Sequence, residues 1–401
     1  MIKKIAIDQL LPGMFVHDLN CGWLDHPFLK SKFPVRDQAT IEKIRAIGIR
    51  ELYIDTIKGA DVFAARTQQE VSEDLDRLLR EIASRDDDKP IAAELKEEAA
   101  RARRLHGEAN RLARNLMGDL RLGMPVEPEK FAPVVDGLVD SVFRNSDALL
   151  PLTRLKSQDS YTFEHSVGVC TLLAAFGRSL GLPRDEIREI ALGGLLHDVG
   201  KAQVDDAIVD KPGKLSEEEF AEMKAHVAKG LVILRAVPDL SATALSVVAE
   251  HHERIDGSGY PAGKKGAQLS RAGQMAAIVD VYDAMCSDRV YHKGMAPTPA
   301  LRKLLEWSEH HFDRALVQAF IRALGIYPTG SLVRLDSGRL GVVVEQNERQ
   351  ILEPVVRVFY HAGKQYYIPP ETVDLSRTQD RIAGFENYEK WNIDPYKWLP
   401  A

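Results

Sequence analysis

Cysteine is scarce in this sequence, and its scarcity narrows the kinds of site that the chain can build. The 401 residues include three cysteines, Cys21, Cys170 and Cys286, which are far apart and form no CxxC pair. A disulfide framework and a thiolate zinc site are therefore not expected. Any metal bound by this chain must use histidine and carboxylate ligands.

Long apolar segments are also missing. Residues 1–8 carry two lysines, but they lack the following run of about 7 to 15 apolar residues that a secretion signal needs. No later run reaches the roughly 18 apolar residues of a membrane span. We therefore expect a cytoplasmic protein without a membrane span.

The chain has no excess of positive charge. Its formal net charge is −6, which argues against binding to a nucleic acid polymer but leaves open a local basic pocket for a small phosphate ligand. With 45% apolar and 28% charged residues, the chain is globular in composition and long enough for two or three domains.

Four stretches differ in their sequence pattern, and together they predict a mainly α protein. The first has short β-branched runs and predicts a small α/β accessory module, whose sensory role is left open. The second predicts two amphipathic helices, a connector or a dimerising hairpin. The third predicts a helical bundle, and the fourth a β-rich extension. In order, the four stretches are residues 1–62, 63–130, 131–328 and 329–401.

Seven side chains in the third stretch could bind metal, and they lie on five successive predicted helices. Singly, such a histidine is usually a packed or surface residue, and such an aspartate is usually solvated. Together they favour a metal site, because buried unpaired imidazoles and carboxylates are costly. They are too many for one tetrahedral zinc and favour two octahedral ions that share a bridging carboxylate, as in a dimetal hydrolase. The seven are His165, His197, Asp198, His226, His251, His252 and Asp280.

Two motifs relate these residues to a known family. Residues 197–201 read HDVGK, which resembles the HDxGK signature of the HD superfamily of metal-dependent phosphohydrolases. Residues 251–261 read HHERIDGSGYP, which resembles the HHE-x-x-DG-x-GYP block of its HD-GYP branch. The resemblance covers residues 131–328, an HD-type helical bundle. The N-terminal stretch, with LPGM at residues 11–14, also resembles an uncharacterised module that often precedes HD-GYP domains.

The resemblance implies a cyclic di-GMP phosphodiesterase that opens its substrate to pGpG, with further cleavage to GMP left open. It implies that all seven residues ligate two divalent ions, with Asp198 as the bridge. Asp198 and Lys201 are the catalytic candidates, because the Lys201 ammonium could contact a phosphate and stabilise the leaving group. The alternative without a catalytic role is that Lys201 is a solvated cation at a helix end. Iron or manganese is favoured, while cobalt, nickel and zinc stay open.

Substrate contacts are expected from two further segments. Gly259 permits close backbone approach, and Tyr260 offers a guanine a stacking face, although a tyrosine packed in an ordinary turn is the competing interpretation. Arg289 belongs to a segment that matches the family's phosphate-gripping segment. His292 stands where many relatives have Lys or Arg, and Lys293 could substitute for it.

Tyr161 favours two ions over three. Some relatives have a Glu four residues before the first ligand histidine and bind a third ion, and this chain has Tyr161 at that position. Glu164 is adjacent to His165 but points about 100° away on a helix. We therefore expect a binuclear site.

Two other functions stay open at this point. The first is a catalytically weak cyclic di-GMP receptor or protein-docking module, against which the intact ligand set argues. The second is an HD phosphohydrolase for another nucleotide, such as a dNTP or guanosine tetraphosphate, against which the GYP block argues. Expected partners are cyclic di-GMP and signalling proteins of the diguanylate cyclase type, and a homodimer through the helical connector is left open.

Overall fold

The computed structural model describes most of the chain and divides it into two compact units. The first unit comprises Met1–Leu78 and Asp206–Met223, and the second comprises Leu79–Asp205 and Lys224–Ala401. The described residues are 1–22, 26, 28, 31–84, 93–154, 161–287, 294–347 and 350–399.

The first unit is built on a small antiparallel sheet. Its strand order is β1-β4-β2-β3, and β4, which lies between β1 and β2, is almost wholly buried. Helix α1 (Gln38–Ala46) packs Ile41 and Ile44 into the core of the sheet, and the Asp37 side chain caps it by accepting from the Thr40 amide. The strands are β1 (Ile2–Ala6), β2 (Phe15–Asp18), β3 (Phe33–Pro34) and β4 (Glu51–Asp55). The predicted small α/β module is confirmed.

The first unit also contains a segment that lies in the sequence between the predicted ligands Asp198 and His226. Residues 206–223 include α7 (Asp206–Val209) and most of α8 (Glu217–Lys224). A capping box precedes α8, since the Glu219 amide donates to Ser216 Oγ and the Ser216 amide donates to Glu219 Oε2. Helix α2 (Gln68–Ala83) begins in the first unit and ends in the second.

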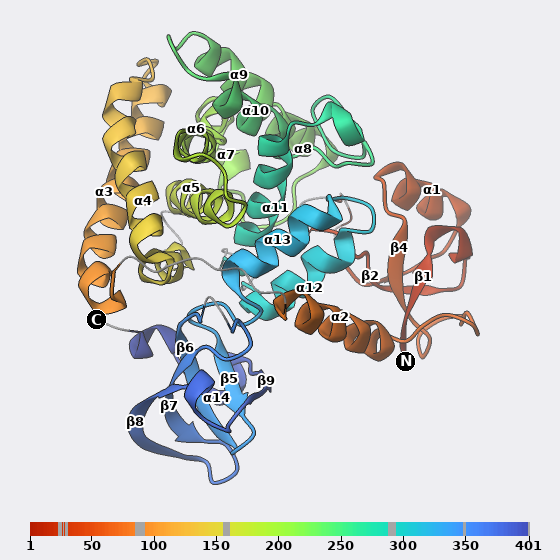
Figure 1. Cartoon of the computed structure of the whole chain (residues 1–401). Helices are drawn as coiled ribbons and strands as arrows, with labels where there is room; N and C mark the ends of the chain where they lie inside the picture. Colours follow the sequence, from red (N-terminus) through yellow and green to blue (C-terminus); the bar gives the residue numbers. More distant parts are fainter. Residues whose placement is uncertain are drawn as a thin grey trace. The chain divides into compact units, whose positions relative to one another are not determined.

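The second unit is mainly helical, with α5 at its centre. In Figure 1, α5 lies among α4, α6 and α11, and it packs against all three. Small residues of α3, such as Ala102 and Ala109, are fully buried in the core that α3 shares with α4, α5 and α6. The helices are α3 (Leu95–Arg121), α4 (Pro128–Leu149), α5 (Tyr161–Ser179), α6 (Arg184–Leu196), α9 (His226–Arg235), α10 (Ala242–Glu250), α11 (Arg271–Cys286), α12 (Pro297–Trp307) and α13 (Arg314–Leu324).

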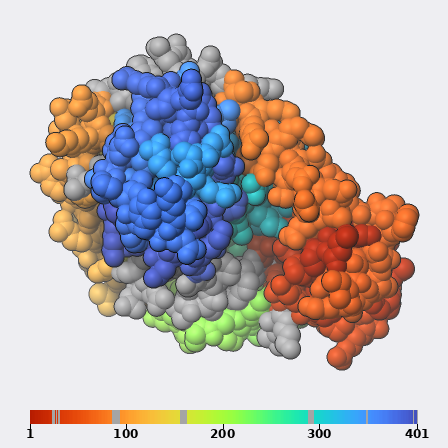
Figure 2. Space-filling model, turned by 90° about the horizontal axis from the view of Figure 1, so that it is seen from below, coloured from red at the N-terminus to blue at the C-terminus, as the bar shows by residue number. Residues whose placement is uncertain are grey.

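The C-terminal extension is a five-stranded antiparallel sheet in the order β8-β7-β6-β5-β9. Phe359 is fully buried in this sheet, and the Trp398 ring stacks on it with centroids 3.9 Å apart. The extension forms one continuous lobe in Figure 2, coloured blue. Its elements are β5 (Leu332–Leu335), β6 (Arg339–Glu345), β7 (Val355–His361), β8 (Tyr366–Asp374), β9 (Ile382–Phe385) and α14 (Tyr388–Trp391). The predicted mainly α fold with a β-rich extension is confirmed.

Within the described part of the chain, no helix combines the length and the apolar character that a membrane crossing requires.

Candidate metal centre

The structure brings all seven predicted ligands together inside the second unit. His165 lies on α5, His197 caps the end of α6, His226 opens α9, His251 caps the end of α10, and Asp280 lies on α11. Asp198 follows His197 at the start of the short helix η4 (Val199–Gln203), and His252 follows His251. All are buried except His252, whose side chain is 19% exposed.

Two glycines allow the elements that carry the predicted ligands to pack closely against one another. A Cβ at Gly193 on α6 would lie 2.8 Å from the Ala244 carbonyl oxygen of α10. A Cβ at Gly200 would lie 1.9 Å from the His226 carbonyl oxygen, so only glycine lets η4 rest against the start of α9. The glycine of the HDxGK motif therefore places Asp198 beside His226.

Asp198 lies at the middle of the cluster. Its Oδ1 lies 3.4 Å from His226 Nε2, whereas its Oδ2 lies 3.3 Å from His197 Nε2 and 2.6 Å from Lys201 Nζ. The two carboxylate oxygens thus face two different groups of imidazoles. This is the placement that a bridging carboxylate between two ions needs.

Asp280 is the second carboxylate of the cluster. Its Oδ1 lies 3.0 Å from His165 Nε2, and its Oδ2 lies 3.6 Å from His252 Nδ1. On the far side of the cluster, His226 Nε2 and His251 Nε2 lie 3.3 Å apart. Two donors on one ion at bonds of about 2.0–2.2 Å are themselves separated by roughly 3 Å, so these spacings fit shared coordination.

Three histidines are oriented by acceptors behind them. His165 Nδ1 lies 2.6 Å from Asp283 Oδ2, His197 Nδ1 lies 2.7 Å from the Gly194 carbonyl oxygen, and His251 Nδ1 lies 2.9 Å from the Val248 carbonyl oxygen. An acceptor at Nδ1 places the proton there and leaves the Nε2 lone pair directed into the cluster. This arrangement is typical of metal-ligating histidines.

The electrostatics keep four of the seven donors in the forms that bind metal. The pKa of His197 is instead raised, because the effect of burial is outweighed by the Asp198 carboxylate beside it. Burial, with the neighbouring His197, lowers the pKa of His251 to about 3, and burial also holds the pKa of His252 well below its usual value. Burial opposes ionisation of Asp198 and Asp280, yet the surrounding imidazoles keep the pKa of each carboxyl well below its usual range. Neutral imidazole and ionised carboxylate are the ligand forms that metal binding requires.

Two orphaned atoms test whether these residues fit a metal. His197 Nε2 and Asp198 Oδ1 are buried and make no hydrogen bond, which is costly unless another group compensates. Potential ligand atoms from three trios of residues each lie within 4.8 Å of one another. The residues therefore fit divalent ions. The trios are His165, His197 and Asp280; His197, Asp198 and His251; and His226, His251 and His252.

Two predicted substrate residues adjoin the cluster. The Tyr260 ring stacks on the His252 ring at a centroid distance of 4.6 Å and an angle of 29°, and Lys224 Nζ lies 5.6 Å from the Tyr260 ring centre. Gly259, which precedes Tyr260, packs against the backbone of residues 252–254. The predicted contacts Arg289, His292 and Lys293 lie outside the described residues, as does the side chain of Tyr161.

Sequence reasoning missed three carboxylates that support the centre. Asp283 lies one helical turn after Asp280 and faces His165, a relation that the i, i+3 spacing could have indicated. Glu250 and Glu253 are buried on either side of the His251–His252 pair. Their roles depend on a loop whose path the sequence does not reveal.

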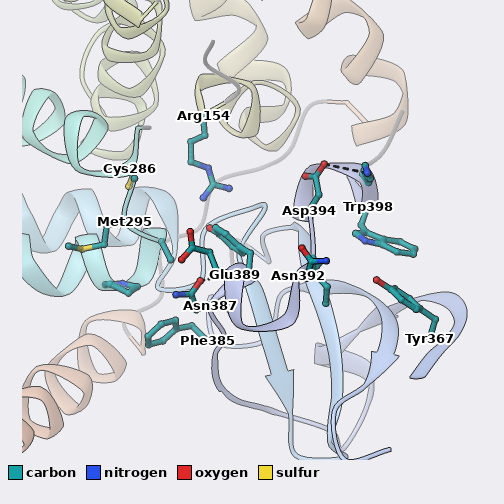
Figure 3. A pocket seen from close by; sticks show the side chains of 16 residues that line it. Arg154, Cys286, Met295, Tyr367, Phe385, Asn387, Glu389, Asn392, Asp394 and Trp398 are labelled. Atoms are coloured by element: carbon teal, nitrogen blue, oxygen red, sulfur yellow. Dashed lines mark hydrogen bonds and ion pairs between the residues drawn. The ribbon is translucent and has the colours of Figure 1, made fainter. Parts of the chain in front are cut away.

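A separate cavity of about 830 Å³ lies in the second unit, and none of the seven residues lines it. Arg154 points into it from above in Figure 3, while Asn387 and Glu389 face it from the start of α14. Several of its lining side chains are exposed, including those of Asn387 and Glu389. It is thus distinct from the histidine cluster.

The fold and the cluster define a metal-binding helical domain of the HD type. Residues 146–316 match the family model described as HD domain, and residues 2–131 match a domain of unknown function, DUF3391. The chain belongs to the HD-GYP proteins that carry this N-terminal domain. An HD domain implies that the chain binds divalent metal.

Curated relatives share this family. A cyclic di-GMP phosphodiesterase of Pseudomonas aeruginosa is 42% identical over 396 residues, which cover 98% of this chain and 94% of the relative. A cyclic di-GMP phosphodiesterase of Thermotoga maritima is 34% identical over 41% of this chain and 45% of its own length. A 3'3'-cGAMP-specific phosphodiesterase of Vibrio cholerae is 36% identical over 38% of this chain and 35% of its own length.

Among solved structures, an HDG"Y"P protein from Bdellovibrio bacteriovorus aligns with 80% of this chain and 98% of its own, at a TM-score of 0.48 and 18% identity.

Proposed function

We propose that this chain is a cyclic di-GMP phosphodiesterase that hydrolyses its substrate to pGpG at a centre of two divalent ions. The observation that carries the proposal is the convergence of five imidazoles on the carboxylates of Asp198 and Asp280. The relative from Pseudomonas aeruginosa, which bears that name and matches along nearly the whole chain, supports the substrate.

The seven residues would hold the ions, with Asp198 between them. When bound, the ions would supply an acidified water and a positive clamp on the phosphodiester. Iron or manganese is our proposal for the metal, because an all nitrogen and oxygen donor set with two carboxylates suits either. The ligand set is His165, His197, Asp198, His226, His251, His252 and Asp280.

The protein's own groups would orient and stabilise the reacting phosphate. Asp198 stays ionised because His197 and Lys201 outweigh the effect of burial on its pKa. The Lys201 ammonium, 2.6 Å from Asp198 Oδ2, would neutralise charge that develops on the leaving oxygen. Tyr260 would stack with a guanine, and Arg289, His292 and Lys293 remain our predicted phosphate contacts.

Two alternatives are weaker. A receptor without turnover would not need the oriented imidazoles and the two ionised carboxylates that this chain keeps. Hydrolysis of a different cyclic dinucleotide is favoured only by relatives that match less than half of this chain, such as the 3'3'-cGAMP-specific enzyme. Further cleavage to GMP, a cytoplasmic location, a homodimer and signalling partners of the diguanylate cyclase type remain predictions.

The test is a substrate comparison on the metal-loaded protein. Chromatography should detect pGpG from cyclic di-GMP, with slower turnover of 3'3'-cGAMP and none of guanosine tetraphosphate. Binding of cyclic di-GMP without any product would favour the receptor. Preferred turnover of one of the other nucleotides would reassign the substrate.

A further inference from the structure

Two buried carboxylates flank the His251–His252 pair without belonging to the ligand set. Glu250 is 4% exposed and Glu253 is 1% exposed. A buried carboxylate is costly unless hydrogen bonds compensate. Their partners therefore show what they stabilise.

Glu253 holds the returning half of the loop that carries Tyr260. Its Oε1 accepts from the Ala262 amide at 2.7 Å, and its Oε2 accepts from the Lys264 amide at 3.1 Å. Hydrogen bonds to an ionised acceptor are stronger than those between neutral groups. One carboxylate thus fixes two backbone positions just beyond Tyr260.

The outgoing half of the same loop is fixed by close packing. A Cβ at Gly259 would lie 2.5 Å from the His252 carbonyl oxygen, so a larger residue would push the loop away. The Tyr260 amide donates to that same carbonyl oxygen at 3.2 Å. With both halves held, the Tyr260 ring lies against the imidazole of His252.

Glu250 binds the start of the helix that carries Asp280. Its Oε2 accepts from the amide and the hydroxyl of Ser270 at 2.8 and 2.7 Å, and Ser270 is the N-cap of α11. A Cβ at Gly273 would lie 2.1 Å from the same oxygen, so glycine makes room for the carboxylate. Negative charge is favourable at a helix N-terminus. The other oxygen accepts from Lys264 Nζ at 2.6 Å.

We propose that Glu250 and Glu253 are a pair of positioning residues with separate tasks. Glu253 sets the place of Tyr260 and thereby recognition of the substrate base, and Glu250 sets the place of α11 and thereby of Asp280. The role in recognition of the substrate base rests on the proposed function. The roles of Glu253 in placing the loop and of Glu250 in placing α11 do not.

Glu253→Gln tests the first task, because an amide cannot accept from both backbone donors without turning its own NH₂ toward one of them. The KM for cyclic di-GMP should rise roughly tenfold, with metal content unchanged. Cleavage of bis(p-nitrophenyl) phosphate, a phosphodiester without a guanine, should stay near the wild-type rate. Equal losses on both substrates would overturn the assignment to base recognition.

A double-mutant cycle keeps the test sharp. Tyr260→Leu should reproduce the KM effect, Tyr260→Phe should largely retain wild-type KM, and Glu253→Gln with Tyr260→Leu should be no worse than either alone. Additive effects would show that Glu253 does not act through Tyr260.

Glu250→Gln tests the second task by metal content. At limiting metal it should bind fewer ions than wild type and lose activity on both substrates, unlike Glu253→Gln. Full occupancy and full activity would overturn this role. Glu98→Gln is the matched control, because Glu98 is buried like Glu250 but binds Ser141 and Arg144 between α3 and α4. It should change neither the metal content nor the ratio of the two substrates.

Amide hydrogen exchange separates this proposal from the function itself. Exchange at Ala262 and Lys264 should quicken in Glu253→Gln, whichever nucleotide the protein cleaves. Unchanged exchange there would overturn the positioning role, whereas quickened exchange in a protein inactive on cyclic di-GMP would overturn only the proposed substrate.

Discussion

Lys201 and Asp198 form an ion pair at the metal centre, with Nζ 2.6 Å from Oδ2 and the carboxylate fully buried. Asp198 also faces His226 through its other oxygen. The lysine therefore contacts the same carboxylate that lies between the two groups of imidazoles.

Replacement of Lys201 by methionine should lower turnover by roughly 100-fold or more, the range seen when one stabilising donor is removed from a transition state. Both metals should remain bound, since none of the seven predicted ligands is replaced. Loss of the ammonium also raises the pKa of Asp198, so the acid limb of the pH–rate profile should move to higher pH. Lys229→Met is the control, because Lys229 contacts the Gln203 carbonyl outside the cluster. A Lys201→Met protein with wild-type turnover would show that this cation only screens Asp198.

His197→Ala and Asp198→Ala should each abolish turnover in a protein that still folds. Each residue is a predicted ligand in a site supported by several helices, so the loss should affect metal binding more than the fold. Circular dichroism, metal analysis and product detection together check this. Full activity in a folded Asp198→Ala protein would refute the bridging role.

Metal analysis of the purified holoprotein should give about two ions per chain. The reason is Tyr161, which stands where some relatives have a glutamate for a third ion. Elemental analysis with a protein concentration from amino-acid analysis provides the count. A value near three would mean that another side chain replaces the missing glutamate.

The metal-free protein should be less stable at pH 5 than at pH 7. Burial lowers the pKa of His251 to about 3 and the pKa of His252 well below its usual value. The folded protein keeps these two imidazoles neutral, whereas the unfolded chain binds protons on them below its histidine pKa of about 6.5. Stability is therefore unaffected by them above that pH and falls as the pH is lowered below it. The raised pKa of His197 acts in the opposite direction, as do the raised pKa values of the Asp147 and Glu345 carboxyls outside the centre. The contribution of His251 is therefore isolated by its own variant. Asp198 and Asp280 do not contribute to this change, because their lowered pKa values place their effect below about pH 4.

Thermal unfolding after chelation measures this pH effect. His251→Asn should flatten the fall in unfolding temperature between pH 7 and pH 5, and His106→Gln, on α3 outside the centre, should keep it. A metal-free protein equally stable at both values would contradict the account of the buried imidazoles.

Four of the seven predicted ligands could be found from the sequence because they lie in two recognisable motifs, residues 197–201 and 251–261, and the other three follow from the family pattern. The orienting groups behind them were harder to find, since the acceptors for His197 and His251 are the backbone carbonyls of Gly194 and Val248. A backbone carbonyl is present at every position and so leaves no sequence signal. The role of Glu253 was hidden for a related reason, because its partners are amides of a loop whose path is set by packing.

Local sequence patterns predicted secondary structure in the fold but not which distant segments pack together. The pattern of residues 329–401 predicted a β-rich extension, and this stretch contains β5 and β6. Composition alone did not show that α3 shares a core with α4, α5 and α6, or that residues 206–223 join the N-terminal module in one compact unit. Such pairings depend on contacts between distant segments, which local periodicity does not encode.

The central claim is tested most directly by metal-dependent product formation. The protein is stripped with a chelator, reloaded with increasing manganese or iron, and assayed for pGpG from cyclic di-GMP alongside Asp198→Ala. We expect no product from the stripped protein, product that rises with bound metal to about two ions per chain, and none from the variant. Product from metal-free protein, or from Asp198→Ala at the wild-type rate, would contradict a phosphodiesterase built on this histidine and aspartate centre.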